Sequence, residues 1–315
     1  MDLISAICVS HSSRWGLLQR AILNYIDQEY RPLELIVAVT EPGYYDQIRS
    51  FIVDRRIIGL ATDVSDLLNI RPLHIRPLLV RGRESVEIFM HALAAARGEW
   101  IACWDDDNLS HPKRFIWQKE RTCRSQPSVL AQSLYYFYDS DELFVTVYAQ
   151  PSGRPADRCA AGSLLFHREA YPVLEFYMRD VWSAHFLDCA GKRLAYDCLA
   201  GDPVLFLAGS NGDNYRGEEF HRRMGSGLPA TWTREAILRQ LPFLEKSLGA
   251  YYFPHSEIDL CGKDAQACKI TGVKTWPDWL ASPLPPEDWR CRLPSREQQN
   301  LLSEERRQAR ERKGT

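Results

Sequence analysis

Hydrophobic and polar positions divide the first hundred residues into short apolar runs and longer stretches of helical spacing. Apolar runs of strand length occupy residues 4–10, 33–39, 74–80 and 100–104. Between them, apolar residues recur every three or four positions, which predicts helices over 14–30 and 85–97 and a helix followed by irregular chain over 44–71. Near-continuous apolar strands separated by helices are typical of a parallel sheet covered on both faces. Gly98 follows the third helix, where we expect it to end the helix in a left-handed conformation.

The pattern after residue 110 is less regular. It predicts helices over 112–124, 180–190 and 233–248, another helix starting at 168, and strands over 128–137, 143–150, 162–167 and part of 194–207. Residues 209–227 form a long glycine-rich polar loop, and loops of that length are often functional. Composition shifts toward tryptophan, proline and charge after residue 250. We therefore expect one domain over 1–250 and a C-terminal extension with a charged tail over 251–315.

The bulk composition is that of an ordinary globular protein, with 45% hydrophobic and 25% charged residues in 315. The net charge of -2 gives no bulk attraction to nucleic acid or anionic membrane, so nucleic acid is not an expected partner. No apolar run approaches the ~18 residues of a membrane-spanning helix, and the N-terminus lacks the features of a signal peptide. Nine cysteines without a C-x-x-C pair fit reduced thiols. These features predict a cytoplasmic protein.

Three consecutive carboxylates, Asp105, Asp106 and Asp107, directly follow the strand predicted over 100–104. The carboxyl end of such a strand lies at the sheet edge where open α/β proteins bind ligands. Adjacent carboxylates repel each other and need a cation or many hydrogen bonds. Side chains alternate along a strand, so Asp105 and Asp107 should point the same way and act together. Oxygen ligands suit Mg²⁺ or Mn²⁺, which predicts a metal-bridged diphosphate; a solvated acidic loop is the alternative.

These aspartates belong to a longer pattern. It reads Gly98-Glu99-Trp100-Ile101, Asp105-x-Asp107, then Ser110-His111-Pro112-x-Arg114-x-x-x-Gln118. The pattern resembles family-2 glycosyltransferases of the GT-A fold, as do the strand at 4–10 and the helix at 14–30. The resemblance covers roughly residues 3–120 and, loosely, 159–215. It implies a Rossmann-like α/β fold with a mixed, mostly parallel sheet flanked by helices. Residues 1–110 would bind the nucleotide sugar and 111–250 the acceptor.

The resemblance implies a metal-dependent, hexosyltransferase-like enzyme. It would move a sugar from a nucleoside-diphosphate donor, a UDP-sugar first because uridine donors are commonest in the family, to an acceptor hydroxyl. Inversion is the expected stereochemistry, Mn²⁺ or Mg²⁺ the expected cofactor, and the acceptor is not identified. Two alternatives stay open: a nucleotidyltransferase on a similar sheet, and a non-catalytic binding protein that retains the fold.

The resemblance also assigns candidate residues for the donor. Asp105 and Asp107 become the D-x-D pair: Asp107 is the first metal ligand, and Asp105 contacts the ribose or reaches the metal through water. Asp106 either contacts the donor or points back into the sheet. The nucleoside would meet residues of two loops, namely Ser10, His11, Ser12 and Glu41. Arg83 would meet the base or a phosphate, with a surface salt bridge as its alternative.

Two further residues are assigned to the chemistry. Asp180 matches the aspartate of a Glu-Asp pair that acts as the general base in inverting relatives, although Arg179 replaces the glutamate, and Asp188 is its rival. The alternative for Asp180 is a residue that only caps a helix. The histidine that touches metal or diphosphate in many relatives is missing from the matching region, and His221 is the candidate substitute. His221 lies in the glycine-rich loop, which we expect to close over the donor.

Overall fold

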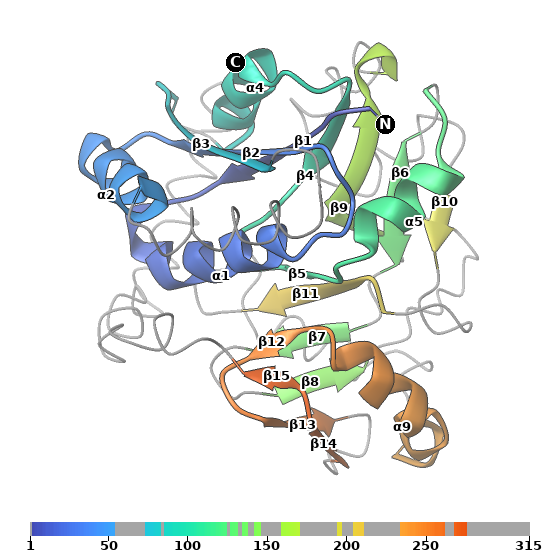
Figure 1. Ribbon diagram of the computed structural model, residues 1–315. Coiled ribbons are helices and arrows are strands. Elements are labelled where there is room, and N and C mark those ends of the chain that lie inside the picture. The colour runs from blue at the N-terminus through green and yellow to red at the C-terminus, as the bar shows by residue number, and fades with distance from the viewer. Residues whose placement is uncertain are drawn as a thin grey trace, which may run out of the picture.

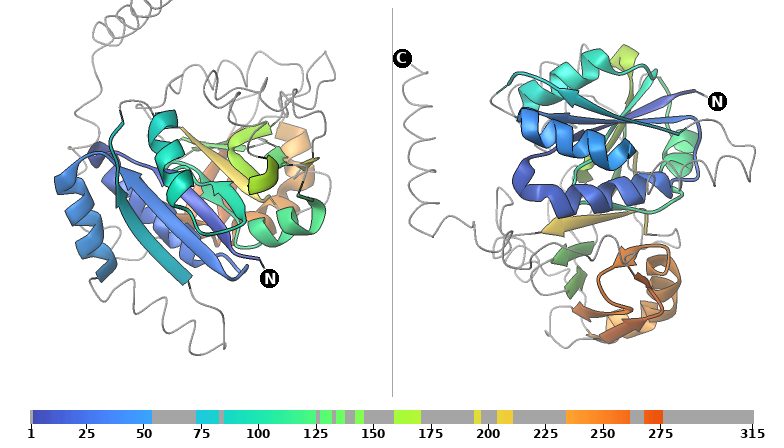
Figure 2. Two further views of the ribbon diagram at one scale, coloured as in Figure 1. Left: turned by 90° about the horizontal axis from the view of Figure 1, so that it is seen from above. Right: turned by 60° about the vertical axis from the view of Figure 1, so that its left-hand side comes forward.

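The computed structural model describes residues 2–53, 73–82, 85–124, 127–131, 134–137, 142–145, 159–170, 194–196, 204–210, 234–261 and 268–275. Within them, two large sheets lie one above the other, and most helices cover the upper sheet (Figures 1 and 2). None of the helices in these ranges combines the length and the apolar character needed to cross a bilayer.

The first sheet has seven strands in the order β10-β6-β9-β4-β1-β2-β3. The neighbours β1 and β2, β1 and β4, β2 and β3, and β6 and β10 run parallel, whereas β9 runs antiparallel to β4 and β6. The predicted mixed, mostly parallel sheet flanked by helices is confirmed. The strands are β1 (Ile4–Val9), β2 (Leu33–Val39), β3 (Leu73–Leu79), β4 (Trp100–Cys103), β6 (Ser128–Ala131), β9 (Cys159–His167) and β10 (Leu194–Tyr196).

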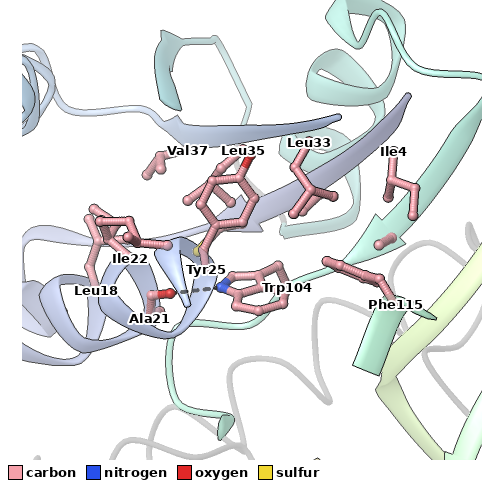
Figure 3. Close-up of a cluster of buried hydrophobic side chains, with 14 of the residues drawn as sticks. Ile4, Leu18, Ala21, Ile22, Tyr25, Leu33, Leu35, Val37, Trp104 and Phe115 are labelled. Carbon is pink, nitrogen blue, oxygen red and sulfur yellow. Dashed lines mark hydrogen bonds between the residues drawn. The ribbon is translucent and has the colours of Figure 1, made fainter. Parts of the chain in front are cut away.

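Helices α1 (Trp15–Ile26), α2 (Pro42–Val53) and α4 (Ser85–Ala95) cover the two faces of this sheet. Each strand contributes to the cores on both faces, because successive side chains of a strand point to opposite faces. One face carries Ile4, Leu33 and Leu35 into a core with α1 and α2 (Figure 3). The opposite face carries Ile7 and Ile36 into a separate core with α4. Burial on both faces is why these strands are almost entirely apolar.

Trp104 fixes the carboxyl end of β4 against α1. Its indole nitrogen donates a hydrogen bond of 3.1 Å to the carbonyl of Ala21, and its ring meets Tyr25 edge-on (Figure 3). The backbone amide of Trp104 donates to the carbonyl of Ile7 on the neighbouring strand. The chain that follows Trp104 therefore starts from a fixed point beside the end of β1.

The second sheet has six strands in the order β14-β13-β8-β7-β11-β5. Helix α9 (Arg234–Leu248) packs on it through Ile237, Leu244 and Leu248. Two short strands, β12 (Tyr252–Phe253) and β15 (Lys274–Thr275), pair beside it. The six strands are β5 (Leu109–Ser110), β7 (Leu134–Phe137), β8 (Glu142–Val145), β11 (Phe206–Ser210), β13 (Glu257–Cys261) and β14 (Cys268–Thr271).

Several predicted elements differ from the structure. The strand expected over 128–137 is two strands, β6 and β7, which belong to different sheets. The apolar pattern cannot show where the chain passes from one sheet to the other, because both strands carry alternating apolar residues into their own cores. The first helix starts as a 3-10 turn, η1 (Ser12–Arg14), and ends at Ile26, while α5 (Arg114–Arg121) is shorter than predicted. Only the short η3 (Arg168–Ala170) is described of the helix expected from 168, and the helix expected over 180–190 lies outside the described residues.

The division at residue 250 stays a prediction. Strand β13, which lies beyond it, pairs in parallel with β8, for example Leu260 with Leu143. Residues on both sides of the division also share one core, in which Tyr251 and Phe253 lie with Tyr136.

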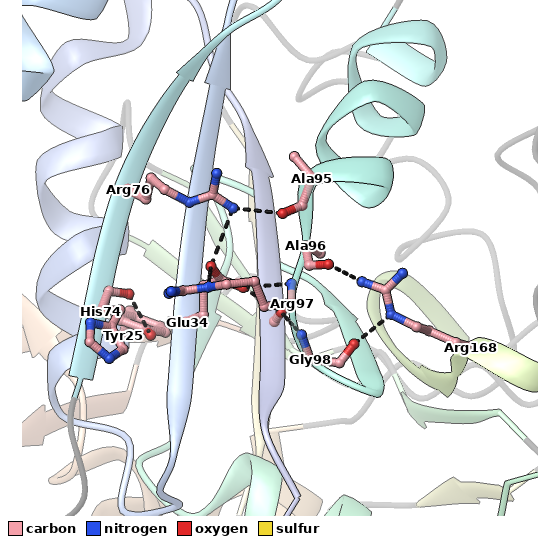
Figure 4. A network of polar contacts seen from close by, with 10 residues as sticks. Tyr25, Glu34, His74, Arg76, Ala95, Ala96, Arg97, Gly98 and Arg168 are labelled. Carbon is pink, nitrogen blue, oxygen red and sulfur yellow. Dashed lines mark hydrogen bonds and ion pairs between the residues drawn. The ribbon is translucent and has the colours of Figure 1, made fainter.

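The amino-terminal halves of the strands are tied together by the buried carboxylate of Glu34 on β2 (Figure 4). It accepts hydrogen bonds from the hydroxyl of Ser5, from the backbone and side chain of Arg97, and from Arg76. Burial alone would raise the pKa of Glu34, but the hydrogen bonds from Arg97 and Ser5 hold it below its ordinary value. The network joins β1, β2, β3 and the turn that leads into β4.

Gly98 lies in that turn, and its role differs from the prediction. Among the described glycines only Gly272 has a positive φ, so Gly98 does not end α4 in a left-handed conformation. The reason for glycine is space: a Cβ atom at Gly98 would lie 2.6 Å from the carbonyl oxygen of Leu3 and 2.8 Å from the amide nitrogen of Ser5. Both are backbone atoms of the segment that forms β1.

We predict that Gly98→Ala destabilises the protein by about 1–3 kcal/mol, the usual cost of overpacking a core, because the chain around β1 must move. Gly43→Ala is the matched control, since a Cβ there meets nothing within 4 Å. Urea unfolding of both variants makes the comparison. Equal stability of the two variants would contradict the steric explanation.

Candidate active site

The aspartate triplet follows β4 at the carboxyl ends of two parallel neighbours, β1 and β4. The next chain segment forms β5, which joins the second sheet by pairing with β11. The triplet therefore lies where the chain leaves the first sheet and enters the second. In open α/β sheets, ligands bind outside the carboxyl ends of the strands.

Asp106 points into the protein, with a side chain only 1% exposed. The hydroxyl of Ser10 donates a 2.7 Å hydrogen bond to Asp106 Oδ2, and the same hydroxyl lies 3.1 Å from the hydroxyl of Tyr44. Arg14 Nη1 lies 2.8 Å from Asp106 Oδ1. Burial raises the pKa of Asp106, and the Arg14 charge opposes that shift. Asp106 is thus buried between Ser10 and Arg14, and its role toward a donor stays a prediction.

Asp107 is more accessible, at 15% exposed, and it shares the same arginine. Arg14 Nη2 donates to Asp107 Oδ2 over 2.6 Å, so one guanidinium bridges Asp106 and Asp107. A second arginine, the buried Arg20 of α1, donates to the backbone carbonyls of both aspartates at 3.3 Å each. The bend after β4 is thus held through its side chains and through its backbone.

Asp105 has a different set of partners. Asn108 Nδ2 donates a 2.7 Å hydrogen bond to Asp105 Oδ2, and Asn108 Oδ1 accepts one of 3.0 Å from the amide of Gly209 on β11. Removal from water, and then the charges of Asp107 and Asp106, raise the pKa of Asp105 to about 7. These hydrogen bonds connect Asp107 to Arg14 and Asp105 to Asn108, and joint action of Asp105 and Asp107 on a ligand stays a prediction.

The residues of the pattern Ser110-His111-Pro112-x-Arg114-x-x-x-Gln118 form a buried support beneath the triplet. The Arg114 guanidinium donates to Gln118, to the hydroxyl of Ser110, and to the carbonyls of Cys103 and Gly162. It lies among aromatic rings, 5.4 Å from the centroid of Trp104, and burial lowers the pKa of Arg114 to about 10. Gln118 donates in turn to carbonyls on β6 and β9. This support connects the end of β4 to β9 and β6.

His111 belongs to the same pattern and packs beside the second sheet. Its backbone amide donates to the carbonyl of Leu205, and its ring meets Tyr251 edge-on at 5.7 Å. Nδ1 of the ring accepts a hydrogen bond from the amide of Lys113, and burial lowers the pKa of His111 to about 4. The neutral imidazole at this position packs against Tyr251.

The other predicted donor-binding residues are divided between described and undescribed parts of the chain. His11 and Ser12 are exposed on the loop after β1, and the amide of Ser12 lies 3.4 Å from Glu41 Oε1. Ser10 is nearby but 2% exposed, with its hydroxyl between Asp106 and Tyr44. The remaining predictions fall outside the described residues: Arg83, Asp180, Asp188, His221 and the loop after Ser210.

The donor set at the triplet fits a hard divalent cation. The described residues contain no group of three or more His, Cys, Asp or Glu side chains arranged to hold a metal. Mg²⁺ usually binds one or two protein carboxylates and completes its shell with water and substrate phosphates. The partly exposed Asp107 provides such a carboxylate at the sheet edge, with Asp105 close along the chain. Arg14 is the positive charge that neutralises Asp107 in this structure.

Sequence reasoning singled out the triplet and left the role of Asn108 open. It missed Arg14 and Arg20, which hold the triplet, and Gly162, which lies against it. Their signals were present: Arg14 follows the polar turn after β1, and Asn108 directly follows the triplet. The sequence does not show which segments, far apart along the chain, lie side by side in the fold. Arg14 and Asp107 lie 93 positions apart along the chain, and Asn108 and Gly209 lie 101 apart.

Comparison with known proteins gives matches only at the level of structure. No family model and no curated protein matches the chain. The matching solved structures include TarS residues 1–349 from S. aureus, at 13% identity over 79% of this chain and 80% of that chain, with a TM-score of 0.43. They also include the mannosyltransferase PcManGT from Pyrobaculum calidifontis in complex with GDP-Man and Mn²⁺, at 11% identity over 77% and 69%, with a TM-score of 0.41. A third is GalNAc-T7 with UDP, GalNAc and Mn²⁺, at 14% identity over 67% and 44%, with a TM-score of 0.44.

Gly162 on β9 lies against the Asp105–Asn108 pair. A Cβ atom at Gly162 would lie 2.1 Å from Asp105 Oδ2 and 2.5 Å from Asn108 Nδ2. We predict that Gly162→Ala displaces Asp105, breaks its hydrogen bond to Asn108 and destabilises the protein by about 1–3 kcal/mol.

A double-mutant cycle tests this assignment by urea unfolding. In an Asp105→Ala background the main obstacle to a side chain at Gly162 is gone, so Gly162→Ala should be less destabilising there by about 1 kcal/mol or more. An identical change in both backgrounds would mean that Gly162 does not act through Asp105.

Proposed function

We propose that this chain is a metal-dependent glycosyltransferase. It would transfer a sugar, with a hexose as the first candidate, from a nucleoside-diphosphate donor to an acceptor hydroxyl, with inversion at the anomeric carbon. The observation that carries the proposal is the carboxylate triplet at the adjoining carboxyl ends of β1 and β4. The D-x-D pattern in that triplet would supply the carboxylates for a metal ion. The hydrogen bonds of Arg114 and Gln118 hold the strand end that carries the triplet.

The leaving group in this reaction is a nucleoside diphosphate, whose negative charge grows as the anomeric bond breaks. Mn²⁺ or Mg²⁺ held by Asp107 would stabilise that charge as a Lewis acid. Asp105, oriented by Asn108, would contact the donor ribose or a water molecule of the cation. Asp106 would hold the bend in shape through Ser10 and Arg14.

The surrounding residues would fix the triplet before any ligand arrives. Trp104 holds the strand end to α1, Arg20 holds the backbone of the bend, and Arg114 holds the last residue of β4 to β9. Groups fixed in this way need little rearrangement as charge develops, which is the main source of electrostatic catalysis. The remaining assignments rest on the resemblance: His11, Ser12 and Glu41 near the nucleoside, Arg83 at the base or a phosphate, His221 at the metal or diphosphate.

A panel of nucleotide sugars with and without Mn²⁺ tests the function directly by thermal shift. UDP-sugars come first, and a donor is expected to raise the melting temperature only when Mn²⁺ is present. Stabilisation by a donor without any turnover would favour a non-catalytic binding protein. Failure of every donor in the panel to bind would refute the proposal.

Asp107→Asn tests the metal ligand. We expect the variant to fold normally and to lose at least ~100-fold in affinity for UDP with Mn²⁺, since residues that only orient a metal ligand already contribute about 10–100-fold to metal affinity. Isothermal titration measures the change. Asp259→Asn, an exposed aspartate on β13, is the control and should bind as the wild type does. An unchanged metal-dependent affinity in Asp107→Asn would remove Asp107 from the metal site.

The general base is proposed to be Asp180. Asp180→Asn should leave binding of UDP and Mn²⁺ intact and lower the rate of transfer by about 10²–10⁴-fold, the usual contribution of a general base. Asp188→Asn, its rival along the chain, is compared in the same assay. Wild-type turnover in Asp180→Asn together with a loss in Asp188→Asn would move the base to Asp188.

A further inference from the structure

The proposed function gives Arg14 a role toward Asp106 but none toward Asp107. It lies between the 3-10 turn η1 and the first turn of α1, and its guanidinium reaches across to the end of β4. Nη1 lies 2.8 Å from Asp106 Oδ1 and Nη2 lies 2.6 Å from Asp107 Oδ2. One guanidinium therefore neutralises two adjacent carboxylates. Nη2 donates a hydrogen bond to Asp107, whereas the contact of Nη1 with Asp106 Oδ1 is an ion pair without a hydrogen bond to that oxygen among the described residues.

The two aspartates that contact Arg14 differ in their exposure to solvent. Asp106 is 1% exposed and also accepts a hydrogen bond from Ser10, so it has a protein partner without Arg14. Asp107 is 15% exposed and Arg14 is 18% exposed, so their contact lies at the accessible side of the cluster. A ligand that arrives from solvent would meet the Arg14–Asp107 contact before the Asp106 side chain.

Arg14 holds one oxygen of the carboxylate that a metal on Asp107 would bind. A divalent cation would bind Asp107 through a carboxylate oxygen, and one of the two, Oδ2, is already in contact with a positive charge at 2.6 Å. Two cations at one carboxylate repel each other strongly where water is partly excluded. Binding of a divalent cation to Asp107 and the present position of Arg14 are therefore in competition.

Arg14 also has hydrogen-bonding capacity that the described residues do not use. Its Nε–H is buried and has no hydrogen-bond partner within the described ranges. An oxygen-rich anion, such as a diphosphate, would satisfy that donor and replace Asp107 as a partner of Nη2. A guanidinium is matched in geometry to phosphate oxygens as well as to carboxylates.

We propose that Arg14 is a resident counter-ion that couples cation binding to nucleotide binding. Without nucleotide, Arg14 holds Asp107 and keeps the affinity for divalent cations low. The diphosphate of a nucleotide gives the guanidinium another partner, Asp107 becomes available, and cation and nucleotide then bind cooperatively. This inference rests on the proposed function in taking Asp107 as the metal ligand and a nucleoside diphosphate as the ligand.

The decisive measurement is the affinity for Mn²⁺ in the absence of nucleotide. Electron paramagnetic resonance monitors Mn²⁺ binding with and without UDP. We expect Arg14→Gln to bind Mn²⁺ about 10-fold more tightly than the wild type in the absence of UDP, because the competing charge is gone. The wild type should show cooperativity between Mn²⁺ and UDP of at least about 5-fold, within the usual range for coupled sites, and Arg14→Gln should lose most of it.

Two further variants make the test specific. Arg14→Lys keeps the charge but not the planar fork, so its Mn²⁺ affinity without UDP should lie between those of the wild type and Arg14→Gln. If circular dichroism shows that Arg14→Gln does not fold, the comparison of Arg14→Lys with the wild type tests the proposal instead. Arg239→Gln removes an equal charge from an exposed arginine of α9, 71% exposed, and should bind Mn²⁺ as the wild type does. Equal or weaker Mn²⁺ affinity in the Arg14 variants would overturn the proposal.

The outcome is separable from that of the proposed function. If the Arg14 variants bind Mn²⁺ more tightly and lose cooperativity with UDP, but no sugar is transferred from any donor, the role of Arg14 stands and the glycosyltransferase activity fails. If the wild type transfers sugar with Mn²⁺ while the Arg14 variants show no gain in Mn²⁺ affinity, the activity stands and the counter-ion role fails.

Discussion

The accumulation of negative charge after β4 is the constraint around which this part of the molecule is built. Three carboxylates in a row cannot lie at the end of a buried strand without compensation. The chain supplies compensation from different directions: Arg14 pairs with two of the side chains, Arg20 holds their carbonyls, and Arg114 lies beneath the strand end. Burial alone would lower the pKa of Arg14, but the charges of Asp106 and Asp107 raise it above its ordinary value. The guanidinium is therefore a permanent charge at any physiological pH.

The same constraint explains the pattern around Ser110 and Gln118. In the sequence, this pattern suggests function because it accompanies the aspartates. In the structure, its polar groups bond to one another and to backbone carbonyls of β4, β6 and β9. Arg114 and Gln118 are 1% and 0% exposed, so they cannot touch a ligand directly. Their contribution is to hold the aspartates in place from behind, which is why a motif can mark a site without lying in it.

Prediction from sequence succeeded where structure is local. Periodicity identified β1, α1, β2, α4 and β4, because each buries a face whose spacing is fixed by its own backbone. It failed where pairing is between distant segments. The separation of β6 from β7 and the parallel pairing of β13 with β8 depend on partners far along the chain. The candidate site divides in the same way. The triplet was singled out from the sequence, whereas its closeness to Arg14 and Gly162, and the hydrogen bond between Asn108 and Gly209, were not predicted.

The two buried carboxylate networks of the first sheet show how a structural acid differs from one that can serve a ligand. Glu34 is 0% exposed and accepts four hydrogen bonds, from Ser5, Arg76 and twice from Arg97, on strands and a turn that are fixed by the sheet (Figure 4). No acceptor is left for an outside group, and replacing any donor would leave a buried charge unpaired. Asp107 has instead a partner at the solvent side, on a side chain that starts from a short 3-10 turn. If another cation replaced Arg14 at Asp107, no hydrogen bond between strands would be lost. The carboxyl ends of the strands can therefore change partners, whereas the Glu34 network cannot do so without loss of the sheet.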